Sequence, residues 1–321
     1  MKTNFLDKLK SLGAVKKTIQ FLDDIIPYGF EGASLYSVLR FFVKGIINPK
    51  FNLYASSLSW NFFLAIFPAL IFLFTLIAYI PILNLQNIIL AQMDFILPDA
   101  AYKVIRSTIK DIVQTQRSGL LSFGILSALY FASNGVFSMM LAFDSNFNDS
   151  EKRKSNFFKK RGVSILLTTW ITTLIIASLI VLITGNYFNA FILKEQLVNK
   201  TIMVFFINLL QFATLFALVF FILSSLYYFG PSSKIKFKFF SPGAIVATFL
   251  SLIATYLFSS YVEDFGNYNK LYGSIGAVIV LMLIIYFNSL CILIGFELNR
   301  SISTVVTIQQ NNRKKENRFL S

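Results

Sequence analysis

Long stretches without a charged residue dominate the chain. Dividing the sequence at every Asp, Glu, Lys and Arg leaves six long windows, at 51–93, 118–143, 162–193, 201–233, 239–262 and 271–296. Each window exceeds the roughly 20 residues that an α-helix needs to cross about 30 Å of hydrocarbon. The pattern therefore predicts six transmembrane helices, near 55–80, 119–143, 162–185, 203–228, 242–262 and 273–298.

The N-terminal segment has a different, amphipathic pattern. Apolar residues recur at helical spacing in 15–27 and again in 34–46. We expect residues 1–50 to form interfacial helices on the cytoplasmic leaflet, with Arg40 and Lys44 at the headgroups. The alternative is that these helices cover the cytoplasmic mouth of the bundle.

Prolines mark two further features. Residues 85–97 and 100–116 flank Pro98–Asp99, and this arrangement predicts a small extracytoplasmic helical cap in which Asp99 is an N-cap. Pro68 lies in the middle of the first predicted span, where it removes a backbone donor and leaves the carbonyl of Leu64 without its usual partner. We expect a kink at Pro68.

Composition agrees with a membrane protein, because 56% of the residues are hydrophobic and only 14% are charged. We predict an all-α fold: a polytopic membrane protein with a six-transmembrane-helix bundle, N-terminal interfacial helices and a small extracytoplasmic helical cap. The expected organisation is an interfacial segment at 1–50, a membrane domain at 51–300 and a basic cytoplasmic tail at 301–321.

The distribution of basic residues predicts the orientation. Of the 29 Lys and Arg residues, 22 lie on the side of the two termini and 7 on the opposite side. By the positive-inside rule, both termini are expected in the cytoplasm. The basic run 152–161 then acts as a topology anchor that touches anionic headgroups. The loop is too short for a nucleic-acid surface, so the net charge of +14 does not indicate nucleic-acid binding.

Ligands for metals and cofactors are scarce in the sequence. The chain has no His, and its single Cys, Cys291, lies within the last predicted span, so no disulfide framework is expected. The few carboxylates are scattered, whereas phosphodiester hydrolysis usually needs a cluster of metal ligands. The phosphate-binding pattern G-x-x-x-x-G-K-[ST] is absent as well. We expect no cofactor and no metal.

Several stretches resemble one family. In the YihY/BrkB family of bacterial inner-membrane proteins, a Y-x-K-x-Y-G-S-like turn enters the last span and a G-x-E-L-N-like ending closes it. The matching residues are Tyr268, Lys270, Tyr272, Gly273 and Ser274, followed by Gly295, Glu297, Leu298 and Asn299. Residues 241–249 resemble the start of the family's fifth span, and residues 55–70 resemble its first span with Pro68. Residues 229–233 depart from the family's usual turn.

The resemblance covers about residues 35–300 and implies a six-span bundle in the bacterial cytoplasmic membrane. It also implies transport of a lipid or a small molecule, which is proposed for several members. An older label of the family is ribonuclease BN, and nothing in this sequence supports a nuclease.

Glu297 is the first candidate for a function, because ionisable groups at membrane depth are costly and usually have a partner or a role. It ends the last span, where the helix dipole disfavours a carboxylate. Arg300 lies three residues further on and can share its face of the helix. Two interpretations stay open: a structural clamp, or a gate or proton-coupling carboxylate at the cytoplasmic mouth.

Two sets of polar residues are further candidates. The turn 263–274, with Tyr268, Lys270, Tyr272, Gly273 and Ser274, either sets the angle between the last two spans or meets a headgroup at the outer mouth. The amides within the spans either join helices, at roughly 0.6 kcal/mol for each hydrogen bond, or line a polar groove. These amides are Asn61, Asn134, Asn208, Gln211 and Asn288.

The function expected first is that of a transporter or flippase-like exporter of a lipid or small amphiphile. Two alternatives are a non-transporting scaffold in envelope assembly and an ion-coupled antiporter, and an enzyme is the least favoured class. The expected partners are membrane lipids, with anionic headgroups at the cytoplasmic basic loops, and self-association into a homo-oligomer stays open.

Overall fold

The computed structural model describes residues 13–77, 118–145, 156–194, 200–232, 237–263 and 274–319. Within these ranges the chain is helical apart from short connections, and it forms no strand there. The helices are α2 (Gly13–Asp24), α3 (Leu35–Ile46), α4 (Pro49–Ile77), α7 (Ser118–Ser145), α8 (Phe157–Lys194), α9 (Lys200–Phe229), α10 (Pro242–Glu263) and α12 (Ser274–Phe319). The predicted cap at 85–116 lies outside the described residues.

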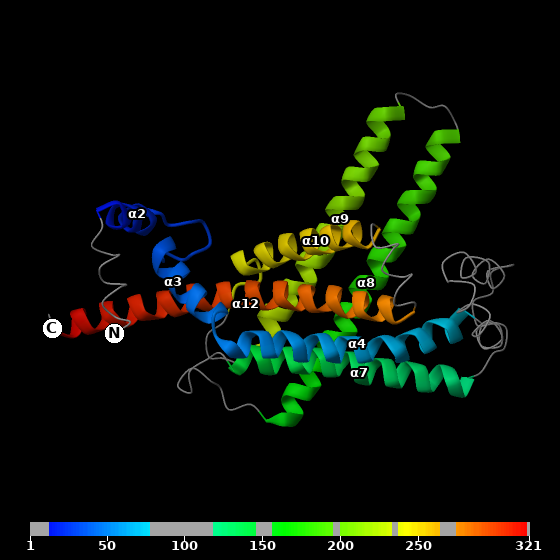
Figure 1. Ribbon diagram of the computed structural model, residues 1–321, viewed down its shortest axis with the longest axis horizontal. Helices are drawn as coiled ribbons and strands as arrows, with labels where there is room; N and C mark the ends of the chain where they lie inside the picture. Colours follow the sequence, from blue (N-terminus) through cyan, green and yellow to red (C-terminus); the bar gives the residue numbers. More distant parts are fainter. Residues whose placement is uncertain are drawn as a thin grey trace.

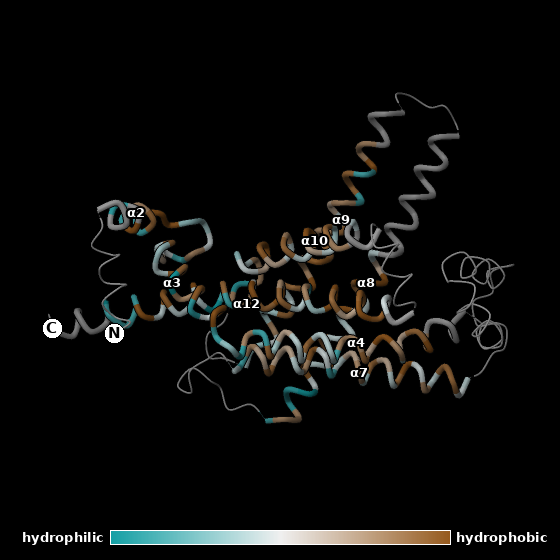
Figure 2. Tube along the Cα trace, viewed as in Figure 1, coloured by the Kyte–Doolittle hydropathy of each residue, from teal (hydrophilic) through white to brown (hydrophobic). Residues whose placement is uncertain are grey.

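Five described helices are long and apolar enough to cross a membrane. Their apolar stretches are Pro49–Phe72, Ser118–Ser145, Phe157–Ser178, Phe205–Phe229 and Val278–Arg313. At the predicted fifth span, α10 provides a shorter apolar stretch, Pro242–Phe258. Hydrophobic residues predominate along the bundle in Figure 2, and polar ones gather toward the end where α10 begins. The prediction of an all-α polytopic membrane protein is confirmed.

The spanning helices pack mainly as antiparallel neighbours (Figure 1). Helix α4 lies along α7, α10 lies along α12, and α12 also contacts α4. Helices α8 and α9 form a hairpin whose far half leans away from these four helices. Helix α4 stays helical through Pro68, and the kink expected there stays a prediction.

Aromatic side chains form the core where α7, α9 and α12 meet. The ring of Phe143 on α7 stacks on Phe296 of α12, with centroids 3.9 Å apart, and meets Tyr227 of α9 edge-on. The Tyr227 hydroxyl donates a hydrogen bond of 2.6 Å to the carbonyl of Ile292. Its polar atom is therefore satisfied inside an otherwise apolar cluster, as buried tyrosines require.

Helix α12 is much longer than a membrane span. Its 46 residues extend over about 69 Å at the rise of an α-helix, more than twice the hydrocarbon thickness. Most of the expected tail at 301–321 is thus a continuation of α12, which projects beyond the start of α10 (Figure 1).

The projecting part of α12 carries a second small core. Its buried residues are Phe30, Ala33, Val38, Ile302, Val305 and Val306. The apolar face of α3 therefore packs on α12, while Arg40 and Lys44 are exposed. The amphipathic pattern of 34–46 predicted the helix correctly, but part of its apolar face meets protein where we expected lipid.

The turn that leads into α3 also contacts the start of α10, and this contact can be tested. Gly29 and Gly32 both have positive φ, of 88° and 86°, so alanine strains the backbone at either position by about 1–3 kcal/mol. Only at Gly29 does an added Cβ meet a neighbour, at 2.8 Å from Cγ of Pro242. We expect Gly29→Ala to lower the thermal unfolding temperature in detergent further than Gly32→Ala, and equal losses would contradict the contact with α10.

Candidate functional site

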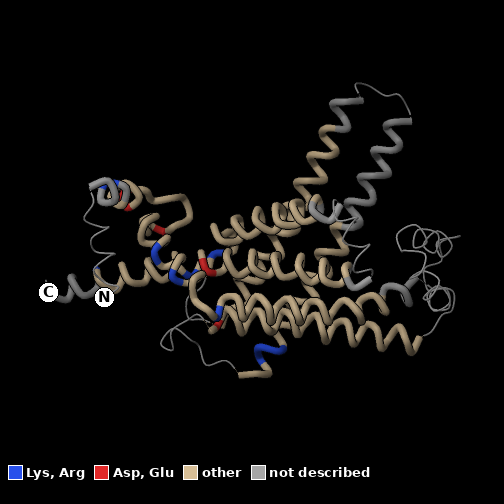
Figure 3. The backbone as a smooth tube through the Cα atoms, in the orientation of Figure 1, with Lys and Arg blue, Asp and Glu red and all other residues tan. Residues whose placement is uncertain are grey.

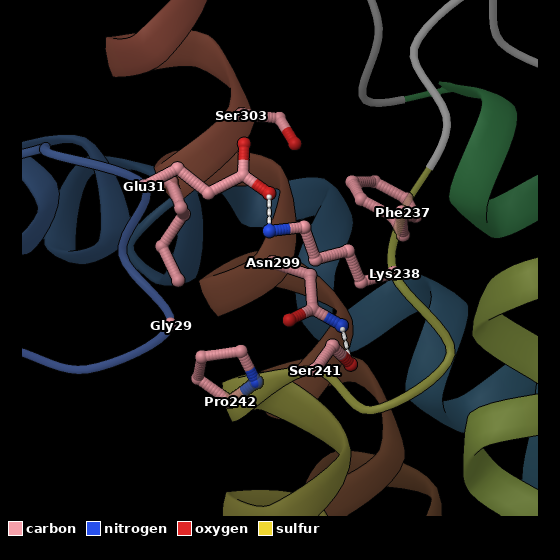
Figure 4. A pocket seen from close by; sticks show the side chains of 9 residues that line it. Gly29, Glu31, Phe237, Lys238, Ser241, Pro242, Asn299 and Ser303 are labelled. Carbon is pink, nitrogen blue, oxygen red and sulfur yellow. Dashed lines mark hydrogen bonds and ion pairs between the residues drawn. The ribbon is translucent and has the colours of Figure 1, made fainter.

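The segment Gly295–Arg300 of α12 contacts α10 through one face and α3 through the opposite face. On the first face, Gly295 and Asn299 are four residues apart and both meet the start of α10. The backbone N–H of Gly243 donates to Oδ1 of Asn299 over 2.8 Å. The Nδ2 of Asn299 donates to the hydroxyl of Ser241, also over 2.8 Å (Figure 4). Asn299 thus caps α10 and is almost completely buried.

Glycines allow this approach of α10 to α12. A Cβ on Gly295 would overlap the carbonyl oxygen of Gly243 and the Cβ of Ala247, and a Cβ on Gly243 would overlap the carbonyl oxygen of Gly295. Backbone atoms cannot move aside as a flexible side chain can. The two helices therefore cross in direct backbone contact, the kind of approach that small residues permit in membranes.

The second face of the segment carries Glu297. Its side chain has no exposed surface, and Nε of Arg300 donates to its Oε2 over 2.9 Å while Nη2 donates to Oε1. Its carboxylate lies against Gly45 of α3, where a Cβ would overlap it. The structure thus brings Glu297 and Arg300 together in a two-pronged pair. Removing one partner of such a buried pair costs about 3–5 kcal/mol.

A small polar pocket lies beside Asn299, between the turn before α3 and the start of α10 (Figure 4). Its volume of about 30 Å³ is enough for a water molecule and too small for a substrate. Across it, Nζ of Lys238 lies 3.0 Å from a carboxylate oxygen of Glu31. Both side chains are exposed, so this ion pair contributes at most about 1 kcal/mol. The pocket is a junction between segments.

A second polar network lies between α4, α7 and α8. The Nδ2 of Asn134 donates to Oδ1 of Asn61 over 2.9 Å, and Nδ2 of Asn61 donates to Ser138 over 3.1 Å. Arg161 extends the network, because its Nη1 donates to Oδ1 of Asn134 over 3.4 Å and its guanidinium lies over the ring of Tyr130. Two of the predicted lining residues are therefore in contact with each other.

Asp144 is a buried acid that the sequence analysis missed. It lies in the last turn of α7, and its Oδ2 is 2.6 Å from Nζ of Lys160 at the start of α8. Its Oδ1 accepts a hydrogen bond of 2.7 Å from the backbone N–H of Ser232, after α9. The sequence did contain a signal for this pair: Asp144 directly follows the apolar window 118–143 and precedes the basic run 152–161.

The other candidate residues do not gather into one lining. Asn288 of α12 donates to Thr255 of α10 over 3.3 Å, Asn208 is exposed on α9, and Gln211 is partly buried on that helix. In the predicted outer turn, Tyr268, Lys270, Tyr272 and Gly273 lie outside the described residues, and Ser274 begins α12. The roles predicted for all of these residues stay predictions.

An apolar groove, which no sequence pattern predicted, lies between α8, α9 and the segment before α10. Its volume is about 560 Å³. The residues of this α8–α9 groove include Val163, Leu166, Leu167 and Trp170 of α8, Ser225 and Phe229 of α9, and Phe239. The groove begins close to the basic start of α8 (Figure 3), because Val163 follows Lys159, Lys160 and Arg161. Among the described residues, no group of three acids or cysteines could hold a metal ion.

These features define a class: a polytopic helical membrane protein with a polar cluster at one end of its bundle. The profile of a family described as Virulence factor BrkB matches residues 42–319. The chain belongs to this family, which confirms the resemblance found in its sequence.

Individual relatives cover most of the chain. YfkH of Bacillus subtilis, named as a ribonuclease-like protein, is 32% identical over 76% of this chain and 87% of its own. UPF0761 membrane proteins of Psychromonas ingrahamii and Haemophilus influenzae are 21% and 23% identical. They align with 86% and 82% of this chain, and with 91% and 94% of their own lengths. No solved structure matches the chain.

The asparagine that caps α10 can be tested against one that makes no such contact. Asn299→Ala leaves the N–H of Gly243 buried without its acceptor, which costs about 1–3 kcal/mol. We expect a clear loss of thermal stability in detergent. The matched control Asn208→Ala alters an exposed residue of α9 and should leave stability almost unchanged. Similar stability of the two variants would contradict the role of Asn299 in joining α10 to α12.

Proposed function

We propose that the protein is a transporter or flippase-like exporter of a lipid or another small amphiphile. We place it in the bacterial cytoplasmic membrane, with both termini in the cytoplasm, in keeping with its basic residues. The observation that carries the proposal is the α8–α9 groove. Its volume of about 560 Å³ lies within the range of small-molecule sites, about 300–1,000 Å³.

The position of the groove suits a substrate that comes from the bilayer. It lies on two helices that are apolar enough to span a membrane. Leu166, Trp170 and Phe229 are 72%, 51% and 54% exposed, so lipid can reach the groove from the side. Asp144 lies near the groove, because it contacts Lys160 at the start of α8 and the backbone of Ser232 after α9. In our proposal the groove admits the substrate, and Glu297, held by Arg300 on α12 and packed against Gly45 of α3, controls its passage.

A scaffold without transport activity is the second candidate. It is favoured by the hydrogen bonds of Asn134 to Asn61 and of Asn288 to Thr255, because such bonds join helices without need of a substrate. An ion-coupled antiporter is a third. Its coupling group would be Glu297 or Asp144, the buried acids among the described residues, and each is held by a cation.

We propose no enzymatic activity. The ribonuclease-like name belongs to the relative from Bacillus subtilis. Phosphodiester hydrolysis usually depends on clustered metal ligands, and the described part of this chain offers no such cluster.

Transport can be tested with purified protein in liposomes. We expect the wild type to move a fluorescent phospholipid between leaflets faster than empty liposomes do. Glu297→Gln keeps the shape of the side chain and an acceptor for Arg300 but removes the charge. We expect this variant to fold and to lose transport by about tenfold, which corresponds to ~1.4 kcal/mol.

The matched control is Glu31→Gln, which makes the same change in an exposed ion pair and should keep the wild-type rate. Equal rates with and without the wild-type protein would refute transport. Unfolding of Glu297→Gln, with normal folding of Glu31→Gln, would show a purely structural clamp and favour the scaffold.

A further inference from the structure

We propose that the α8–α9 groove binds an anionic phospholipid, with an acyl chain along Val163, Leu167 and Trp170 and the phosphate near Lys159. This inference deepens the proposed transport function and rests on it for the assumption that the occupant is a substrate. The inference adds the groove as the place where one anionic lipid binds and Lys159 as the residue that recognises its phosphate.

The groove suits an alkyl chain because its polar atoms already have partners. The indole Nε1–H of Trp170 donates to the hydroxyl of Ser225 over 3.2 Å, and that hydroxyl donates to the carbonyl of Phe221 over 2.7 Å. The other described lining residues have aliphatic or phenyl side chains. A polar ligand would lose its hydration there without gaining hydrogen bonds, whereas a hydrocarbon chain loses nothing.

A basic residue, Lys159, lies on the same face of α8 as the groove. Lys159 precedes Val163 by four residues, so the two lie on the same face of α8. Three basic residues follow one another here, but Lys160 is paired with Asp144 and Arg161 donates to Asn134. Lys159 is exposed, and no described residue forms an ion pair with it. Of the three, it is therefore the one that we assign to the phosphate.

The spacing along α8 agrees with a lipid in this orientation. Lys159 and Trp170 are eleven residues apart, which corresponds to about 16 Å along the helix axis. A basic residue at the end of a span marks the headgroup level, so Trp170 lies beside the chain region of a lipid whose phosphate contacts Lys159. Among the described residues that line the groove there is no acid, so none of them repels an anionic headgroup.

The chain offers a direct test because it has only two tryptophans. Trp60→Phe leaves Trp170 as the single indole reporter. This variant is placed in vesicles of zwitterionic lipid that contain increasing fractions of a chain-brominated phospholipid, which quenches indole fluorescence on contact. We expect phosphatidylglycerol to quench Trp170 several-fold more strongly than phosphatidylcholine at low, equal mole fraction. Lys159→Gln should abolish this difference, and Lys159→Arg should retain it.

Trp170→Phe supplies the matched control, because Trp60 on α4 is exposed to almost the same extent, 52% against 51%. In this control, both lipids should quench Trp60 in proportion to their mole fraction. Three results would overturn the proposal: equal quenching of Trp170 by the two lipids, a preference that survives Lys159→Gln, or the same preference at Trp60. The last would indicate general attraction of anionic lipid to a basic protein. Quenching measures lipid binding and does not depend on transport. The binding proposal and the transport proposal can therefore fail independently of each other.

Discussion

The contact between α10 and α12 is the constraint on which the rest of the bundle depends. Gly243 and Gly295 allow the two backbones to touch, and Asn299 supplies the acceptor that the first turn of α10 needs. In hydrocarbon, association of helices relies on such close packing and on satisfied polar groups, because burial from lipid provides no hydrophobic gain. With this crossing established, α12 can present Phe296 to the aromatic core and Glu297 to α3.

Polar groups within the described bundle serve mainly to join helices. Asn61 and Asn134 connect α4 to α7, Asn288 connects α12 to α10, and Asp144 connects α7 to α8. A charged or amide side chain without a partner is costly in a low-dielectric interior, so each is held by a neighbour. The α8–α9 groove differs from these joints, because it is apolar and open at the surface. It lies close to the contact of Asp144 with Lys160.

The elements of the fold could be predicted from the sequence better than their contacts. Windows without charge indicated the spanning helices, because length and apolarity are local properties. The pairing of Glu297 with Arg300 followed from their spacing on one helix. The contact of Asp144 with Ser232 could not be found in this way, because 88 residues separate them and only the packing of α7 and α9 brings them together. The amphipathic pattern of α3 likewise cannot distinguish lipid from protein as the partner of its apolar face.

The sequence by itself determined the solvent of this protein, the number of its apolar windows and the family to which it belongs, since each of these depends on residue types in order along the chain. Tertiary structure alone decided which polar residues pair, where α12 continues past the bundle, and where a groove stays open between α8 and α9. The physical reason is that a groove is a property of the space between helices. That space depends on crossing geometry and side-chain packing between residues far apart in the chain, which no local pattern records.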